Sequence, residues 1–282
     1  MGINELQQKA DNFVKQVEEL NRLRDRMMKI KYKVAVISGK GGVGKSLVTV
    51  NLAAALAMRG NCVGVLDADL HGPTVPKMLG LKGKHLEAGD DGIIAPVGAL
   101  GIKAVSMDFI LPSQDTPVIW RGPLKMGAIR QFLADVAWGD LDFLLIDLPP
   151  GTGDEPLSIL QLLPEVDGVV IVTIPSEVSG DVVEKSVTFA RQMNVPIIGV
   201  VENMSDLVCP HCGEVIALFG KGAGKMVSEE MKVPFLGAIP MDPRIAADSD
   251  NGRPFISEHP ETPAAEAFNK IVAKIEASIG SK

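Results

Sequence analysis

The fold expected for this chain is decided by the stretch Ser38–Ser46, which reads SGKGGVGKS. From Gly39 to Ser46 it fits the pattern G-x-x-x-x-G-K-[ST]. The apolar, β-branched run at 33–37 before it is typical of a buried strand, and the Leu- and Ala-rich segment at 47–59 after it is typical of a helix. A strand, a glycine loop and a helix in this order aim backbone N–H groups and a positive helix end at phosphates. The stretch therefore predicts a nucleotide-binding loop.

The residue types inside the loop fit phosphate chemistry. Glycines let the backbone turn tightly and approach a ligand with no Cβ in the way. Lys45 can carry a positive charge to the β- and γ-phosphates, and the Ser46 hydroxyl can ligate Mg²⁺. The alternative is a glycine turn that only packs, which would not need a lysine and a hydroxyl at these two places.

Carboxylates follow two further apolar strands. The run at 62–66 ends at Asp67 and Asp69, and the run at 143–146 ends at Asp147. Carboxyl ends of strands border the ligand crevice of open α/β sheets, and an apolar strand that ends in aspartate is the form of a metal-holding Walker B element. The alternative for Asp67 and Asp69 is helix capping or turn formation. The glycine–proline loop at 148–154 can order around a γ-phosphate.

The remaining segments predict an α/β fold. Further apolar strands are expected at 102–106, 168–174, 196–201 and 235–239, and helices at 120–136, 180–193 and 263–279. Continuous apolar strands that alternate with helices are typical of a doubly wound, mostly parallel sheet with helices on both faces. We expect a P-loop NTPase fold, with one domain over residues 31–282 preceded by an N-terminal helix in residues 1–30.

Two terminal helices leave their packing open. The N-terminal helix has a thin apolar stripe, which predicts either packing on the domain or a dimeric coiled coil. This stripe consists of Val14, Val17, Leu20, Met27 and Ile30. The tail helix has a similar stripe, and because its charges are mixed rather than basic, core packing is favoured over membrane binding.

Composition excludes several classes of function. The chain has 282 residues, 46% hydrophobic and 4% aromatic, and a net charge of −7, which argues against nucleic-acid binding. It has no apolar run of the roughly 20 residues that span a bilayer, and the polar segment Met1–Glu5 is unlike a signal peptide. Three cysteines argue against a disulfide framework. We expect a cytoplasmic protein without a nucleic-acid or membrane partner.

Cys209 and Cys212 form a C-x-x-C pair in an expected turn at 209–212. This spacing lets two thiolates face one metal, and tetrahedral sulfur sites usually take four ligands. Cys62 falls inside an expected buried strand, so each chain offers one pair, and a two-fold dimer would place two pairs around one cluster. Zinc at the same dimer site, a redox dithiol and a structural turn are the alternatives. His211, between the cysteines, is expected to point outward.

Longer motifs resemble one family. Lys40 follows the first glycine of the loop directly, as in the deviant phosphate loop of the MinD/Mrp group. The segments DADLHGP at 67–73, DLPPGTGD at 147–154, VENMS at 201–205, CPHC at 209–212 and IPMDPR at 239–244 resemble its Mrp/ApbC/Nbp branch. The resemblance runs from about residue 22 to the C-terminus. It implies an iron–sulfur cluster carrier with ATPase activity.

The resemblance also implies residue roles. Lys40 would reach across a dimer interface to the partner's nucleotide, Lys45 would hold phosphate, and Asp69 would position the attacking water, so these three are the expected catalytic residues. Mg²⁺ would be held, directly or through water, by Ser46, Asp69 and Asp147. A 4Fe–4S cluster shared across the dimer would be held by Cys209 and Cys212.

Base recognition is implied at the C-terminal end of the sheet, with Asn203 on the adenine and Pro240 and Asp242 beside it. Leu47 stands where the family usually has threonine, so a hydroxyl contact to the α-phosphate is missing and backbone N–H groups would have to serve. The full expected nucleotide set is Gly39, Lys40, Gly41, Gly42, Val43, Gly44, Lys45, Ser46, Leu47, Asp147, Asn203, Pro240 and Asp242.

The expected function is a slow ATPase, binding ATP and Mg²⁺, that carries a cluster as a homodimer and passes it between scaffold proteins and apo-proteins. A positioning ATPase of the MinD or ParA kind is one alternative. A scaffold that holds zinc and a structural nucleotide is the other.

Overall fold

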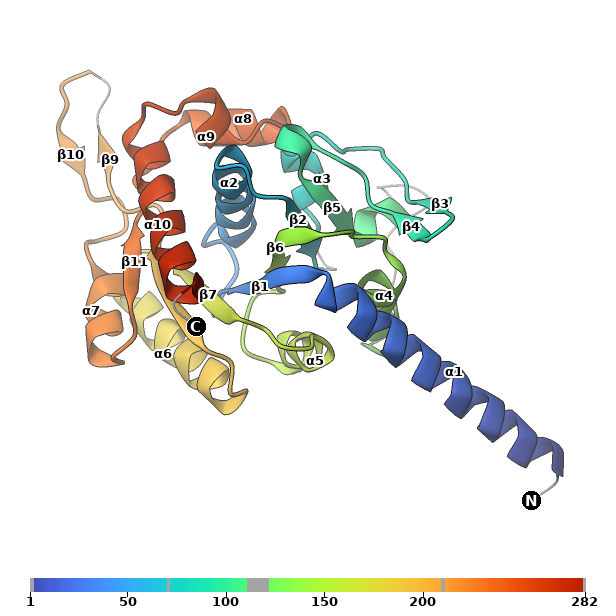
Figure 1. Ribbon diagram of the computed structural model, residues 1–282. Helices are drawn as coiled ribbons and strands as arrows, with labels where there is room; N and C mark the ends of the chain where they lie inside the picture. Colours follow the sequence, from blue (N-terminus) through green and yellow to red (C-terminus); the bar gives the residue numbers. More distant parts are fainter. Residues whose placement is uncertain (1–2, 70–71, 111–121, 209–210, 281–282) are drawn as a thin grey trace.

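A parallel sheet of seven strands forms the centre of the computed structural model, which describes residues 3–69, 72–110, 122–208 and 211–280 (Figure 1). The strand order is β11-β8-β7-β1-β6-β2-β5, and every pairing is parallel. The strands are β1 Ile30–Ile37, β2 Val63–Asp67, β5 Lys103–Ser106, β6 Leu141–Asp147, β7 Gly168–Thr173, β8 Ile197–Glu202 and β11 Phe235–Ala238. The expected doubly wound parallel sheet is confirmed.

Helices cover both faces of this sheet. They are α1 Ile3–Met28, α2 Lys45–Met58, α3 Val75–Met78, α4 Gly122–Asp135, α5 Asp154–Leu162, α6 Glu177–Gln192, α7 Ala223–Glu230, α8 Arg244–Asp250, α9 Phe255–Glu258 and α10 Pro263–Gly280. Along β1, Val34 and Val36 join a core with α2, α3, α9 and α10, whereas Ala35 and Ile37 join a core with the end of α1, α4, α5, α6 and α7. The alternation follows from the two-residue period of a strand, which buries both faces of β1.

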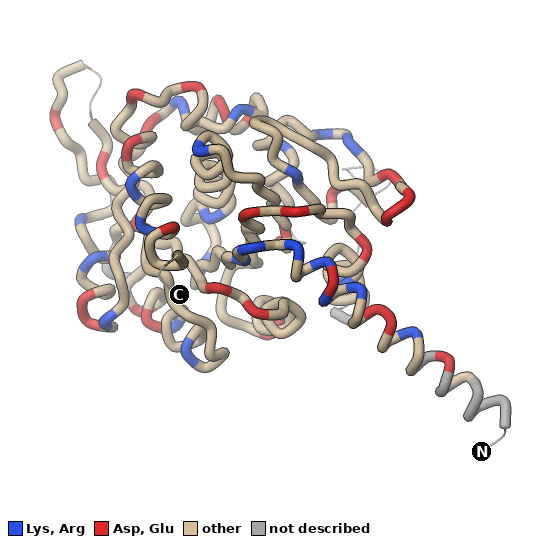
Figure 2. The backbone as a smooth tube through the Cα atoms, viewed as in Figure 1, with Lys and Arg blue, Asp and Glu red and all other residues tan. Residues whose placement is uncertain are grey.

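Two antiparallel hairpins and two short 3₁₀ turns complete the described chain. The hairpins pair β3 Glu87–Gly89 with β4 Gly92–Ile94, and β9 Leu207–Val208 with β10 Val215–Ile216; the turns are η1 Ala99–Gly101 and η2 Met107–Ile110. The β9–β10 hairpin and the start of α1 project from the body on opposite sides (Figure 1). Acidic and basic residues are interspersed along the described backbone (Figure 2). None of the described helices has the length and apolar character needed to cross a membrane.

The apolar stripe of α1 divides into two parts. Met27 is buried, together with Leu23, which the expected stripe omitted. Ile30 is also buried, but it is the first residue of β1, because the helix ends at Met28 rather than at residue 30 as expected. The packing interpretation is correct for this end, where α1 lies on α4 and Arg22 Nε is 3.3 Å from Asp135 Oδ1. It is wrong for the earlier part of the stripe, where the helix extends beyond the described part of the body (Figure 1). There Val14, Val17 and Leu20 are exposed.

The expectation that Cys62 lies in a buried strand is wrong. Cys62 is exposed and precedes β2, which begins at Val63. Its backbone N–H donates to Asp142 Oδ2 at 2.8 Å, so the N–H bonds to a side chain of the neighbouring strand β6 rather than to a backbone carbonyl of the sheet. Cys62 precedes the first residue of β2, whereas Cys212 follows the last residue of β8. Because the strands are parallel, the two cysteines lie at opposite ends of the strands.

Candidate nucleotide site and cysteine hairpin

The phosphate loop joins β1 to α2 at the carboxyl edge of the sheet. Gly42 and Gly44 have φ values of 80° and 77°, which L side chains rarely adopt. Gly44 caps α2 without a side-chain hydrogen bond, and the first turn of the helix has no acidic residue. The first N–H groups of α2 therefore keep their positive field toward the loop, as a phosphate site requires.

Two glycines of the loop fit their neighbours closely. A Cβ at Gly39 would lie 2.1 Å from Val182 Cγ1 on α6, and one at Gly44 would lie 2.4 Å from Asn203 Nδ2. Gly39 therefore seats the loop against α6, which differs from the ligand approach expected of the loop glycines.

Asp147, at the end of β6, gathers three side chains of α2. Lys45 Nζ lies 2.7 Å from Asp147 Oδ1, and the two side chains are 5% and 0% exposed. The Ser46 hydroxyl donates to Oδ2 at 2.5 Å, and the Thr49 hydroxyl donates to Oδ1 at 2.8 Å. The structure thus brings together three residues that the sequence singled out, and adds Thr49. The signal for Thr49 was its place one turn beyond Lys45 on the expected helix.

Asp67 is buried and stands opposite Asp147 in the register of the neighbouring strands β2 and β6. Burial raises the pKa of the Asp67 carboxyl well above its ordinary value, the Asp147 charge raises it further, and Lys45 opposes both. Asp67 accepts hydrogen bonds from Asp69 N–H at 3.2 Å and Val75 N–H at 3.3 Å. It therefore holds both ends of the loop after β2. The position of Asp67 at the end of a strand did not predict this role.

The two remaining expected catalytic residues lie at the same edge. Asp69 is partly buried and accepts from the Gly72 N–H at 3.4 Å. Lys40 is partly buried, and its carbonyl accepts from the Ser38 hydroxyl at 3.0 Å. Their roles in catalysis stay predictions.

The side chains expected at the base lie around the ends of β8 and β11. The Asn203 amide is buried and donates to the Val43 carbonyl of the phosphate loop at 2.9 Å. Asp242 accepts from Arg244 at 2.6 and 2.9 Å, and these hydrogen bonds hold its pKa below the ordinary value. Pro240 lies partly buried between them in sequence. Contact of these residues with adenine stays a prediction.

The cysteine hairpin differs from the phosphate loop in its exposure. Cys209 lies outside the described residues, whereas Cys212 and His211 are exposed. Exposed apolar side chains surround the hairpin: Val208, Val215, Ile216, Leu218 and Phe219. Across the described ranges, no three His, Cys, Asp or Glu side chains gather into a group that could hold a metal ion.

A buried carboxylate connects the two regions. Glu202, next to Asn203, accepts the Gly224 N–H at the start of α7 at 2.7 Å. Burial raises the pKa of Glu202, while the N–H groups of Gly224 and Gly222 lower it. The hairpin begins shortly after Asn203 and is followed by α7. Residues 202–206 therefore lie between the Asn203 contact with the phosphate loop and the first strand of the hairpin. No sequence pattern pointed to Glu202.

Three comparisons with known proteins agree with this geometry. The family model described as ParA: NUBPL iron-transfer P-loop NTPase matches residues 29–276. An iron-sulfur cluster carrier protein of Saccharolobus solfataricus is 56% identical over 254 residues, which cover 90% of this chain and 86% of the relative.

Solved structures show the same fold. A nucleotide-binding protein of Archaeoglobus fulgidus in complex with ADP is similar with a TM-score of 0.77 and 42% identity, covering 88% of this chain and 96% of the other. The cell division ATPase MinD of Pyrococcus furiosus is similar with a TM-score of 0.65 and 25% identity, covering 88% of this chain and 99% of the other.

Proposed function

The chain belongs to the NUBPL iron-transfer P-loop NTPase family, and from this premise we propose that it is an ATP-dependent carrier of iron–sulfur clusters. The observation that carries the nucleotide half is the group around Asp147, where Lys45, Ser46 and Thr49 meet beneath an uncapped helix N-terminus. The cluster half rests on the relatives' name and on the exposed cysteine of the hairpin.

The residues of the phosphate loop fit ATP with Mg²⁺. ATP and Mg²⁺ supply the phosphoryl group and the metal charge when bound. The α2 N-terminus and the positive-φ glycines form the phosphate cradle, and Lys45 neutralises phosphate charge. The Ser46 hydroxyl and the Asp147 carboxylate, in contact with each other, would hold the metal or its water.

Hydrolysis is the finer part of this proposal. Asp69 lies in the loop that Asp67 holds at both ends, which places a carboxylate at the crevice to orient water. Lys40 adds a second cation to the loop, and in the proposed dimer it serves the partner's nucleotide. Slow turnover suits a switch, because a switch needs different affinities in two states rather than fast chemistry.

The cluster is cargo, and its site needs a second chain. One chain supplies the thiols of Cys209 and Cys212, and four sulfur ligands are the usual set for a 4Fe–4S cluster. A two-fold dimer brings two such pairs together. The exposed apolar side chains around the hairpin would then be buried between copies, which suits a surface that is costly to leave in water. Transfer to apo-proteins follows as the carrier's task.

Nucleotide binding reaches the hairpin through residues 202–206. Asn203 contacts the phosphate loop, Glu202 holds the start of α7, and Ser205 N–H donates to Ile239 O at 3.0 Å. A shift of the loop on binding ATP therefore moves the base of the hairpin, and with it the cysteines.

Anaerobic reconstitution with iron and sulfide tests the proposal. We expect about four irons and four sulfides per two chains, with loss of both in Cys209→Ala and in Cys212→Ala. Cys62→Ala is the matched control, because this cysteine is also exposed but lies at the other edge of the sheet. Each variant is checked for ATP binding by titration calorimetry. Full iron content in the Cys209→Ala/Cys212→Ala double variant, or zinc in place of iron in the wild type, would contradict the carrier function.

A positioning ATPase is the second candidate, because the fold is shared with MinD of Pyrococcus furiosus at 25% identity. It predicts that ATP recruits the protein to lipid vesicles or DNA. Sedimentation with each, with and without ATP, separates the two functions.

A further inference from the structure

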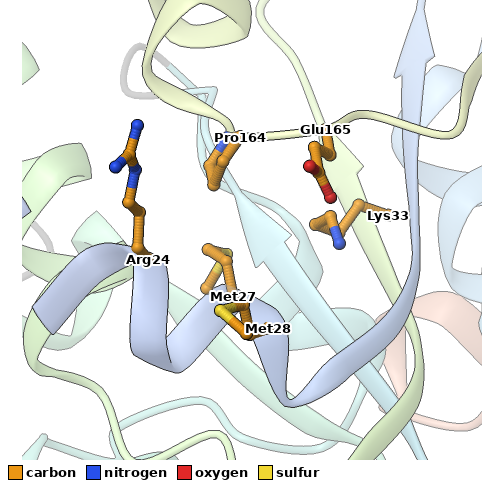
Figure 3. Close-up of a pocket in the computed structure, with 6 residues that line it drawn as sticks. All are labelled: Arg24, Met27, Met28, Lys33, Pro164 and Glu165. Carbon is orange, nitrogen blue, oxygen red and sulfur yellow. The ribbon is translucent and has the colours of Figure 1, made fainter. Parts of the chain in front are cut away.

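A pocket of about 330 Å³ lies at the amino ends of the strands, whereas the phosphate loop lies at their carboxyl ends. Figure 3 shows the residues that line this pocket. It lies between the end of α1, the start of β1 and the connection from α5 to β7, and its lining is Arg24, Met27, Met28, Lys33, Pro164 and Glu165. Strands of a parallel sheet all run the same way, so the start of β1 and the phosphate loop after it are separated by the length of the strand. The pocket therefore takes no part in the nucleotide site.

Lys33 places a buried cation in this pocket. The residue is 6% exposed, and its ammonium donates one hydrogen bond, to the Ile30 carbonyl at 3.2 Å. Within the described part of the chain, no Asp or Glu carboxylate oxygen lies within 4.0 Å of the Lys33 ammonium nitrogen, which is the limit for an ion pair. An ammonium has three N–H donors, and burying one without an anion is costly. Two donors thus remain for a ligand.

Charged side chains of both signs line the pocket. Arg24 stands on one wall, and on the other the Glu165 carboxylate faces Lys33 (Figure 3). The lining thus holds two cations and one carboxylate, and a second carboxylate, Asp167, lies beside it and accepts from the Lys33 backbone N–H at 2.8 Å. Glu165 has a φ of 53°, a conformation that few residues other than glycine adopt.

Two methionines supply an apolar wall. Met27 is 1% exposed and belongs to the core, whereas Met28 is 81% exposed. Methionine side chains are flexible and polarizable, and they adapt to ligands of irregular shape. A pocket with a buried ammonium that has donors to spare, and with an adaptable apolar wall, suits a ligand that has a carboxylate and a small apolar body.

We propose that this pocket binds a carboxylate attached to an aliphatic group, with the carboxylate between Arg24 and Lys33 and the aliphatic part against Met27 and Met28. The C-terminus of a partner protein that ends in an aliphatic residue supplies this chemistry, and so does a free aliphatic acid. The pocket lies at the amino ends of the strands and the cysteine hairpin at their carboxyl ends. A partner bound in the pocket therefore leaves the hairpin and the phosphate loop accessible. This binding does not depend on the proposed carrier function.

The test uses the full chain and three probes. The first is a fluorescein-labelled hexapeptide that ends in leucine with a free carboxylate, the second is its C-terminal amide, and the third is hexanoate as a competitor. By fluorescence anisotropy, we expect the acid peptide to bind at least tenfold more tightly than the amide, because the amide lacks the charge. Lys33→Met and Arg24→Gln should each weaken the acid peptide about tenfold, and Lys84→Met, which removes an exposed lysine elsewhere, should not change it.

A variant of opposite sign separates this site from a structural role. Glu165→Gln removes the opposing carboxylate, so we expect it to bind the acid peptide several-fold more tightly. Circular dichroism and ATP binding report folding, and if Lys33→Met does not fold, Arg24→Gln carries the test because Arg24 is exposed. Hexanoate that displaces the peptide and binds as tightly supports the site with a free acid as its ligand. Equal binding of acid and amide peptides, or no saturable binding of peptide or hexanoate, overturns the proposal.

Discussion

The phosphate loop and the cysteine hairpin both follow the carboxyl ends of strands, but they are built in different ways. At the loop, Lys45 and Asp147 are almost fully buried and each finds its partner inside the chain. At the hairpin, two strands of two residues each carry Cys212 into solvent among exposed apolar side chains. The charged site is satisfied by one chain, whereas the sulfur site offers too few ligands to hold a cluster alone. The difference explains why the proposed carrier needs a second copy to complete the ligand set of its cargo, whereas the side chains around Asp147 meet within one chain.

Removing Lys45 gives the largest expected effect. Lys45→Met leaves Asp147 buried without its counter-ion, so we expect the free energy of unfolding to fall by about 3–5 kcal/mol and ATP binding to become undetectable. Urea denaturation and titration calorimetry measure the two. In Lys45→Met/Asp147→Asn the buried charge is gone, so stability should recover in part while ATP binding stays lost. Equal stability of the single and double variants would contradict this account of the buried pair.

Thr49 gives the next effect. Thr49→Val keeps the shape of the side chain but removes the hydroxyl, which lies within hydrogen-bond distance of Asp147 Oδ1 and of the Lys45 carbonyl, so we expect a loss of about 1–3 kcal/mol in stability and weaker binding of Mg·ATP. Thr49→Ser should restore most of both. Thr74→Val is the control, since Thr74 is exposed and makes no capping hydrogen bond at the start of α3. A loss of the same size in Thr74→Val would show that the hydroxyl–Asp147 contact is not the cause.

Asp67 makes stability depend on pH. Its pKa is raised in the folded chain, so above about pH 4 the folded state holds a proton that the unfolded state has released. The free energy of unfolding then falls as the pH rises from the unfolded pKa to the folded one, by at most about 1.4 kcal/mol per pH unit. Asp67→Asn should remove this slope and be more stable than the wild type at pH 7. Urea denaturation from pH 4.5 to 7.5 without nucleotide measures it, and parallel slopes would count against the raised pKa.

Glu202 tests the connection between the two regions and gives the smallest effect. Glu202→Gln keeps an acceptor for the Gly224 N–H but loses the charge, so we expect ATP affinity to change by less than about threefold. The rate at which iodoacetamide alkylates Cys212 should respond to ATP in the wild type and respond less in the variant. Lys225→Met, an exposed change on α7, is the control. An unchanged response in Glu202→Gln would remove residues 202–206 as the connection.

Local patterns in the sequence predicted much of the nucleotide edge. The glycine loop, the strand before it and the aspartates that end β2 and β6 lie where strand periodicity and motif spacing placed them. Such patterns succeed because strand burial and loop geometry depend on neighbouring residues. They missed Thr49 and Glu202, because each acts through a partner distant in sequence: Thr49 bonds Asp147, and Glu202 bonds Gly224. They also misplaced Cys62, because its backbone N–H bonds to the Asp142 side chain of β6, which is distant in the sequence.

By itself the sequence determined the class of the fold and the chemistry of the phosphate loop, because continuous apolar strands and a glycine-rich turn admit few other structures. Only the tertiary structure decided the strand order, the burial of Lys45 against Asp147, the separation of Cys62 from the hairpin and the exposure of the first part of the α1 stripe. It also brought Lys33, Arg24 and Glu165 around one pocket. Contacts of this kind depend on where crossover connections place distant segments, and no local pattern records that choice.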